Sequence, residues 1–150
     1  MQIARYRAAR SVIALDGSAL HLAAFVLPRN ARVTMILRRS RANASDYIRQ
    51  YKSFLGITPA VIDVIRHDWV AGAAGRADFR SIGELDLARL FDTFKAMGLA
   101  PQNFRPDLPD VDELRAMLQN FEARRGEPFR ILGAQEVNPE AQAEDQNEAA

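Results

Sequence analysis

The strongest pattern in the first quarter of the chain is a strand, a turn, a helix and a second strand. The apolar run over residues 11–15 lacks alternation, as expected of a strand covered on both faces, and it ends in a turn over residues 16–18. Residues 18–27 have the length and apolar content of a helix that ends at Pro28, and residues 32–37 have the composition of a strand. Parallel strands need a connection of about a dozen residues or more, which this segment supplies. The pattern therefore predicts a βαβ unit.

Further helices and strands are predicted along the rest of the chain. Three polar residues precede helix-like apolar stripes and are expected to be N-caps: Asn43, Ser81 and Asp110. Residues 60–65 have the Val and Ile content of a third strand. The other expected helices cover residues 2–10, 44–55, 81–97 and 110–125, the last with Val111, Leu114, Leu118 and Phe121 on its buried side. A loop is expected over 71–77 and a proline-punctuated connector over 101–109, and residues 129–132 form either a final short strand or merely an apolar clip.

These elements predict an α/β fold with a Rossmann-like parallel sheet flanked by helices. We expect one such domain over residues 1–134, with a helical C-terminal part over about residues 81–125. Residues 135–150 are rich in Gln, Glu, Asn and Ala without apolar periodicity, and they are expected to form a disordered acidic tail.

Composition adds an uneven distribution of charge. The chain has 150 residues, 48% of them hydrophobic, and a formal net charge of +1. Five of the 19 acidic residues lie in residues 135–150, which contain no Lys or Arg, so the preceding body holds 14 acidic against 20 basic residues. A moderately basic body suits an anionic ligand. It is too weak a signal for nucleic acid, because the arginines lack interleaved aromatic residues and no nucleic-acid-binding motif is present.

Other properties of the chain exclude several classes of protein. With no cysteine, the chain has neither disulfides nor thiolate chemistry, which fits a reducing compartment. No apolar run reaches the roughly 18 to 20 residues of a membrane span, and the N-terminus lacks a signal-peptide pattern. We therefore expect a soluble, cytoplasmic protein with no transmembrane segment.

The turn Asp16-Gly17-Ser18 is the first candidate for chemistry. It lies at the carboxyl end of a predicted strand and the start of a helix, where free N–H groups and the helix dipole favour a phosphate. Gly17 can take a positive φ and can let a ligand approach the backbone, and Ser18 is placed to cap the helix. The alternative is an ordinary Asx or Ser cap, because Gly17 stands alone and Asp16 would repel a nearby phosphate.

Basic side chains provide the second set of candidates. Arg38, Arg39 and Arg41 follow the second strand, and their guanidinium groups can hold a diphosphate in bidentate fashion, unless they form only a solvated basic loop. His21, on the first turn of the helix after Gly17, either contacts a ligand or packs, partly buried, beside its neighbouring leucines.

The remaining polar residues do not form a recognisable catalytic group. His67 and Asp68 are adjacent in a strand-like segment and would point to opposite faces, so they are a weak base and acid pair. No His, Asp and Glu spacing matches a metal site, and no Ser-His-Asp arrangement is legible. No catalytic residue is identified.

Residues 2–37, and more loosely the segment to residue 57, resemble the C-terminal half of family 61 glycosyltransferases. Members have a turn signature like His-Gly-Ala-x-Leu-Thr-Asn, a helix ending in Phe-x-x-Pro and a strand of the type Val-Ile-Glu. Here residues 16–22 read Asp-Gly-Ser-Ala-Leu-His-Leu, followed by Phe25-Val-Leu-Pro28 and by Val-Thr-Met-Ile over residues 33–36. Asp16 stands where the family usually has His.

The resemblance implies one half of a GT-B enzyme, in which two Rossmann-like domains enclose a nucleotide-sugar. The C-terminal domain holds the donor, which is a substrate, and no cofactor or catalytic metal is expected. The implied reaction is transfer of a sugar, with inversion, to a saccharide acceptor in polysaccharide biosynthesis. The expected donor-binding residues are Asp16, Gly17, Ser18, His21, Arg38 and Arg39. The N-terminal domain would be missing or on a partner chain.

Two other functions remain open from the sequence. A noncatalytic Rossmann-like interaction domain would keep the fold without the transferase chemistry, and Asp16 in the place of His favours it. A small nucleic-acid-binding protein is the less favoured alternative.

Overall fold

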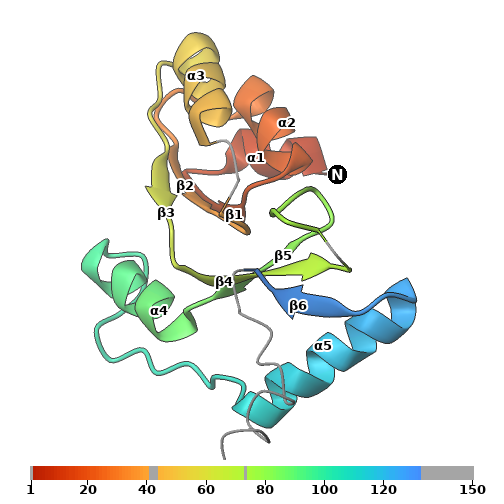
Figure 1. Cartoon of the computed structure of the whole chain (residues 1–150). Helices are drawn as coiled ribbons and strands as arrows, with labels where there is room; N and C mark the ends of the chain where they lie inside the picture. The colour runs from red at the N-terminus through yellow and green to blue at the C-terminus, as the bar shows by residue number, and fades with distance from the viewer. Residues whose placement is uncertain (1, 41–43, 73, 133–150) are drawn as a thin grey trace, which may run out of the picture.

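The computed structural model describes residues 2–40, 44–72 and 74–132. Within those ranges the chain forms five helices and six strands, arranged in two three-stranded sheets (Figure 1). In chain order they are α1 (Gln2–Ala8), β1 (Ser11–Leu15), α2 (Ser18–Val26), β2 (Arg32–Ile36), α3 (Ala44–Leu55), β3 (Ala60–Ile62), β4 (Ile65–Ala71), β5 (Ile82–Leu85), α4 (Leu87–Ala96), α5 (Val111–Arg125) and β6 (Phe129–Ile131).

The first sheet is parallel, with strand order β1-β2-β3, and it confirms the predicted βαβ unit and the α/β class. Val12 pairs with Val33, and Met35 pairs with Val61. Helix α2 forms the crossover between β1 and β2, and α3 forms the one between β2 and β3. Both crossovers bring the carboxyl ends of their strands to the same edge of the sheet, where Rossmann-like folds place ligands.

Alternate residues of β2 contribute to two different hydrophobic clusters. Met35 belongs to the larger cluster, in which α2 and α3 pack against the sheet, and Tyr51 of α3 lies fully buried there. The Tyr51 hydroxyl donates to the carbonyl of Leu20 at 2.9 Å, so the polar atom brought in by this aromatic residue is satisfied. Ile36, with its side chain on the other face, joins the smaller cluster around Leu90 of α4.

The second sheet is antiparallel, with strand order β5-β4-β6, and the sequence pattern did not predict it. The expected strand over residues 60–65 is divided between β3 and the start of β4. The predicted helix over residues 81–97 is wrong in its first part, because residues 82–85 pair with β4 as β5. Asp86 rather than Ser81 caps the helix that follows, through its side chain and the Arg89 N–H. Pairing with β4 outweighs the local helical periodicity.

Helix α5 begins and ends as predicted but is not buried as predicted. Asp110 and Glu113 form a reciprocal capping box, and Gly126 ends the helix with φ 71°. None of its residues is buried, and Val111 is 70% exposed. The helix is attached at its C-terminal end, where the Phe121 ring packs edge-on against Phe129 with centroids 5.3 Å apart. Its apolar stripe is therefore largely open to solvent.

Some predictions fall outside the described residues: the Asn43 cap, Arg41 and the tail over residues 135–150. Elsewhere, residues 101–109 contain neither helix nor strand, as the prolines indicated, and β6 occupies the predicted last strand. No helix in the described ranges combines the length and apolar character needed to cross a membrane.

Candidate functional site

The candidate site lies at the carboxyl edge of the parallel sheet, where β1 leads into Asp16 and β2 leads into Arg38. The Asp16 side chain is 4% exposed. Its Oδ1 accepts the backbone N–H of Arg38 at 2.7 Å, and its Oδ2 lies 3.5 Å from Nε of the same arginine. The Arg38 side chain is 47% exposed, so its guanidinium group retains donors that face solvent. The structure thus brings together two predicted residues from neighbouring strands.

Tyr47 of α3 adds a hydroxyl to this edge that the sequence interpretation missed. Burial raises the pKa of Tyr47 above its ordinary value, and the Asp16 carboxylate adds to the increase, while Arg38, the backbone of Gly17 and Arg39 oppose it. The tyrosine hydroxyl therefore interacts electrostatically with four of the predicted residues. Tyr47 also packs, partly buried, against the larger hydrophobic cluster, and its helical spacing with the buried Tyr51 gives no local signal that distinguishes the two tyrosines.

His21 of α2 stacks on Tyr47, with ring centroids 4.4 Å apart and an angle of 20° between the planes. Its Nδ1 is hydrogen-bonded to Oε1 of Gln50 on α3, and the side chain amide of Gln50 reaches the His21 carbonyl at 3.4 Å. The residue is exposed, so the interpretation of a partly buried histidine is wrong. Two contacts from α3 therefore hold the imidazole beside the cluster of Asp16 and Arg38.

The start of α2 differs from the predicted cap. Gly17, not Ser18, is the N-cap residue, and no side chain caps this end of the helix. Gly17 has φ 166° and ψ 175°, an extended conformation open to any residue, so its backbone does not use the left-handed region that favours glycine. A Cβ built on Gly17 would meet no atom within 4 Å. Neither backbone geometry nor packing requires glycine here.

The second sheet contacts the same edge through residues 38–40. The Arg38 carbonyl accepts the N–H of Gly83 at 2.9 Å, and Nη1 of Arg39 donates to the Phe79 carbonyl at 3.3 Å. The N–H of Ser40 donates to Oδ1 of Asp68 at 3.1 Å. In Figure 1 the connection between β4 and β5 rises from the second sheet towards the parallel sheet. The candidate site therefore lies where the two sheets meet.

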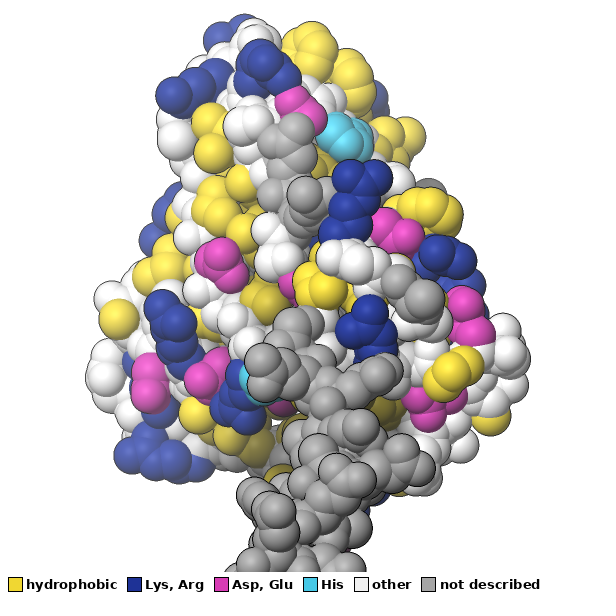
Figure 2. All heavy atoms as spheres, viewed as in Figure 1, with side chains coloured by type: hydrophobic (Ala, Val, Ile, Leu, Met, Phe, Trp, Pro, Cys, Tyr) yellow, Lys and Arg dark blue, Asp and Glu magenta, His cyan; other side chains and the backbone are white. Residues whose placement is uncertain are grey.

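The predicted pair of His67 and Asp68 does not form in the structure. His67 is exposed whereas its neighbour Asp68 is buried, as expected of adjacent residues in a strand, so they do not form a base and acid pair. Among the described residues, no group of three His, Asp or Glu side chains is placed to hold a metal ion. In Figure 2, Lys and Arg side chains form separate patches over the visible face.

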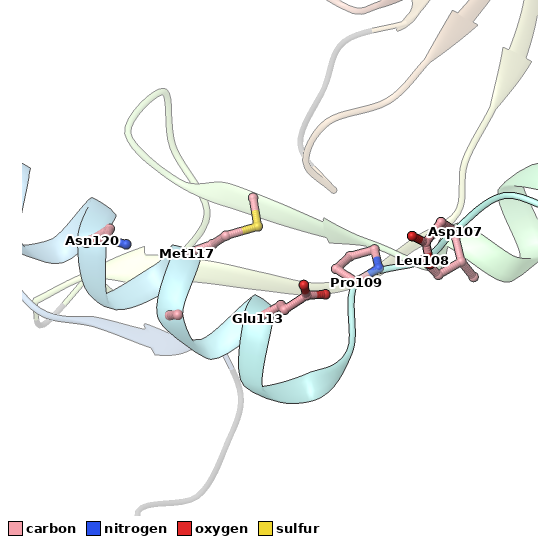
Figure 3. A pocket seen from close by; sticks show the side chains of 7 residues that line it. Asp107, Leu108, Pro109, Glu113, Met117 and Asn120 are labelled. Atoms are coloured by element: carbon pink, nitrogen blue, oxygen red, sulfur yellow. The ribbon is translucent and has the colours of Figure 1, made fainter.

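A separate hollow of about 440 Å³ lies along α5 and the connector before it (Figure 3). Its lining includes Asp107, Pro109 and Met117, together with Glu113. The Glu113 carboxylate is already used by the capping box, where it accepts the Asp110 N–H at 3.0 Å. No residue of the carboxyl-edge cluster lines this hollow, and its acidic groups do not suit a phosphate.

Comparisons of the chain with protein-family models, with curated proteins and with solved structures found no match. The candidate site is therefore interpreted from its own geometry.

Proposed function

We propose that the chain binds the diphosphate of a nucleotide-sugar at the carboxyl edge of the parallel sheet. In this proposal it is the Rossmann-like donor-binding part of a GT-B glycosyltransferase similar to family 61, and the acceptor is a saccharide. The residues assigned to donor binding are Asp16, Gly17, Ser18, His21, Arg38 and Arg39, with Tyr47 added by the structure.

The observation that carries the proposal is the glycine at position 17. Gly17 has an extended backbone and open space where a side chain would project, yet it lies at the junction of β1 and α2. Glycine is expected at such a position when a ligand must approach the backbone closely. No side chain caps the helix end beside it, where the Leu20 N–H donates to the Gly17 carbonyl at 2.9 Å. A helix N-terminus without a side-chain cap favours an anion.

Charge at the edge also supports an anionic ligand. The sequence raised the objection that Asp16 would repel a phosphate. In the structure this carboxylate is buried and accepts a backbone N–H from Arg38, with the guanidinium group of the same residue beside it. Its negative charge is therefore paired with that of Arg38, whose half-exposed guanidinium group retains hydrogen-bond donors for phosphate oxygens, and the nearby Arg39 adds a positive charge.

Calorimetric titration with UDP, GDP and CMP tests this proposal. We expect heat of binding with one nucleotide, and loss of that heat in Gly17→Leu, because the new side chain would occupy the space assigned to the phosphates. Gly75→Leu is the matched control, since a Cβ on Gly75 also meets nothing within 4 Å and the residue is exposed. Unchanged binding by a folded Gly17→Leu variant would remove the site assignment.

The alternative of a noncatalytic interaction domain is favoured by a different observation. On edge strand β1, Ile13 is 42% exposed and Leu15 is 50% exposed. Apolar side chains at an open sheet edge favour association with another chain. If none of the nucleotides binds the folded wild-type chain, and the solution mass rises with protein concentration, this alternative replaces the donor-binding proposal.

A further inference from the structure

The backbone of residues 38–40 is held from both sheets at once. Asp16, at the end of β1, accepts the Arg38 N–H at 2.7 Å, and Asp68, within β4, accepts the Ser40 N–H at 3.1 Å. Between these two bonds, the Arg38 carbonyl accepts the Gly83 N–H from β5 at 2.9 Å. The segment that carries the two assigned arginines is thus fixed by residues of β4 and β5 and by the residue that follows β1.

Asp68 has a position that the second sheet does not itself require. Asp68 lies within β4 and is 7% exposed. Its Oδ1 accepts the backbone N–H of Ser40, in the segment after β2. Burying a carboxylate is costly unless it accepts good hydrogen bonds. Its backbone carbonyl takes part in the sheet edge by accepting the Leu132 N–H at 2.8 Å, so only the side chain is directed to residues 38–40.

Gly83 meets the same segment at a distance that only glycine permits. A Cβ at this position would lie 2.2 Å from the Arg38 carbonyl oxygen and 2.7 Å from the carbonyl carbon. Both atoms belong to the backbone, so a side chain would force β5 and the Arg38 peptide apart. Glycine within a strand commonly marks such a close approach of another backbone.

We propose that Asp68 and Gly83, from the second sheet, are positioning residues for the phosphate-binding arginines, an inference that rests on the proposed function. They act through the backbone of residues 38–40 and do not touch the ligand. Their effect is to fix the peptides from which Arg38 and Arg39 extend, so that less conformational freedom is lost when a diphosphate binds. The second sheet is therefore part of the anion site.

The test compares the affinities of the full chain for UDP and for uridine, which lacks phosphates. Asp68→Leu removes the acceptor at similar size, and we expect about a tenfold loss of UDP affinity with little change for uridine, since about 1.4 kcal/mol corresponds to a factor of ten. Asp68→Asn keeps an Oδ1 acceptor for the Ser40 N–H and should retain UDP affinity within about threefold, a difference of well under 1 kcal/mol. A merely structural role would not separate UDP from uridine.

Gly83→Ala provides a second, independent variant, and Gly75→Ala is its control because a Cβ on Gly75 meets no atom. We expect Gly83→Ala to lose UDP affinity and Gly75→Ala to bind like the wild type. Folding of each variant is checked by circular dichroism, and Gly83→Ala decides the question if Asp68→Leu is unfolded. Wild-type UDP affinity in both Asp68→Leu and Gly83→Ala would overturn this inference alone. If GDP or CMP binds in place of UDP, the same comparison is made with that nucleotide and its nucleoside. Absence of binding of all three nucleotides by the folded wild-type chain would overturn the proposed function and this inference with it.

Discussion

At the scale of single residues, Asp16 shows how one carboxylate can organise a site without being exposed in it. Its two oxygens face the backbone and the side chain of Arg38, and its charge also raises the pKa of Tyr47. An acidic residue at this position is therefore compatible with an anion site, since it fixes an arginine whose guanidinium group remains half exposed. The sequence pattern showed only that an acid lay close to a predicted phosphate position.

Asp16→Asn tests this arrangement directly. Asn keeps an oxygen for the Arg38 N–H but has no charge, so the pKa of Tyr47 should fall towards its ordinary value while remaining raised by burial. The measurement is an NMR titration of the Tyr47 ring carbon at alkaline pH. Asp63→Asn is the control, because Asp63 is not among the groups that shift this pKa. An unchanged Tyr47 pKa in Asp16→Asn would contradict the proximity of the two groups.

At the scale of elements, the sequence pattern predicted those helices and strands whose position is decided by local interactions. The βαβ unit, the ends of α5 and the last strand follow from short-range signals such as Pro28, the Asp110 capping box and Gly126. β5 was missed because Ile82-Gly83-Glu84-Leu85 is strand only by pairing with β4, which is a tertiary interaction. For the same reason the sequence located Arg38 and Arg39 but not the role of Asp68, which depends on a second sheet.

Asp86, between β5 and α4, allows the corrected helix start to be tested. Its carboxylate accepts the Arg89 N–H at 3.0 Å and lies 3.5 Å from Nη2 of Arg66. The pKa of Asp86 is lowered mainly by the hydrogen bond from the Arg89 N–H and, to a smaller extent, by the charge of Arg66. A lowered carboxyl pKa stabilises the fold above the ordinary Asp pKa of about 3.9, and the contribution is lost as pH falls through the folded-state value. Asp86→Ala should therefore unfold at a lower urea concentration at pH 7, with a smaller difference from wild type in acid.

The control for this helix cap is Asp92→Ala, since the Asp92 side chain is 76% exposed and pairs only with Lys95 on the same helix in the described contacts. Urea unfolding of this variant should stay close to wild type at both pH values. If Asp86→Ala were as stable as Asp92→Ala at pH 7, the helix would not depend on this cap.

At the scale of the whole molecule, the two faces of β2 belong to cores of different size. The larger core joins the parallel sheet to α2 and α3, and it includes Leu20, which is 1% exposed. The smaller one links β2 and β3 to α4 through Leu90, which is 6% exposed. Because the candidate site lies where the two sheets meet, its order depends on both cores, although the residues assigned to ligand binding all lie in the parallel half.

Unequal cores predict unequal local stability, which amide hydrogen exchange can measure. Leu20→Ala removes a fully buried side chain from the larger core and should cost about 2 to 5 kcal/mol, with faster exchange across β1, β2, α2 and α3. Leu90→Ala should speed exchange mainly in α4 and leave α2 near the wild-type rate, because the smaller core can open while the larger one stays packed. Faster exchange throughout both halves in Leu90→Ala would show instead that the two sheets unfold as one unit. In that case local opening could not separate Asp68 and Gly83 from the two arginines. The ligand-binding edge would then be as stable as the fold itself.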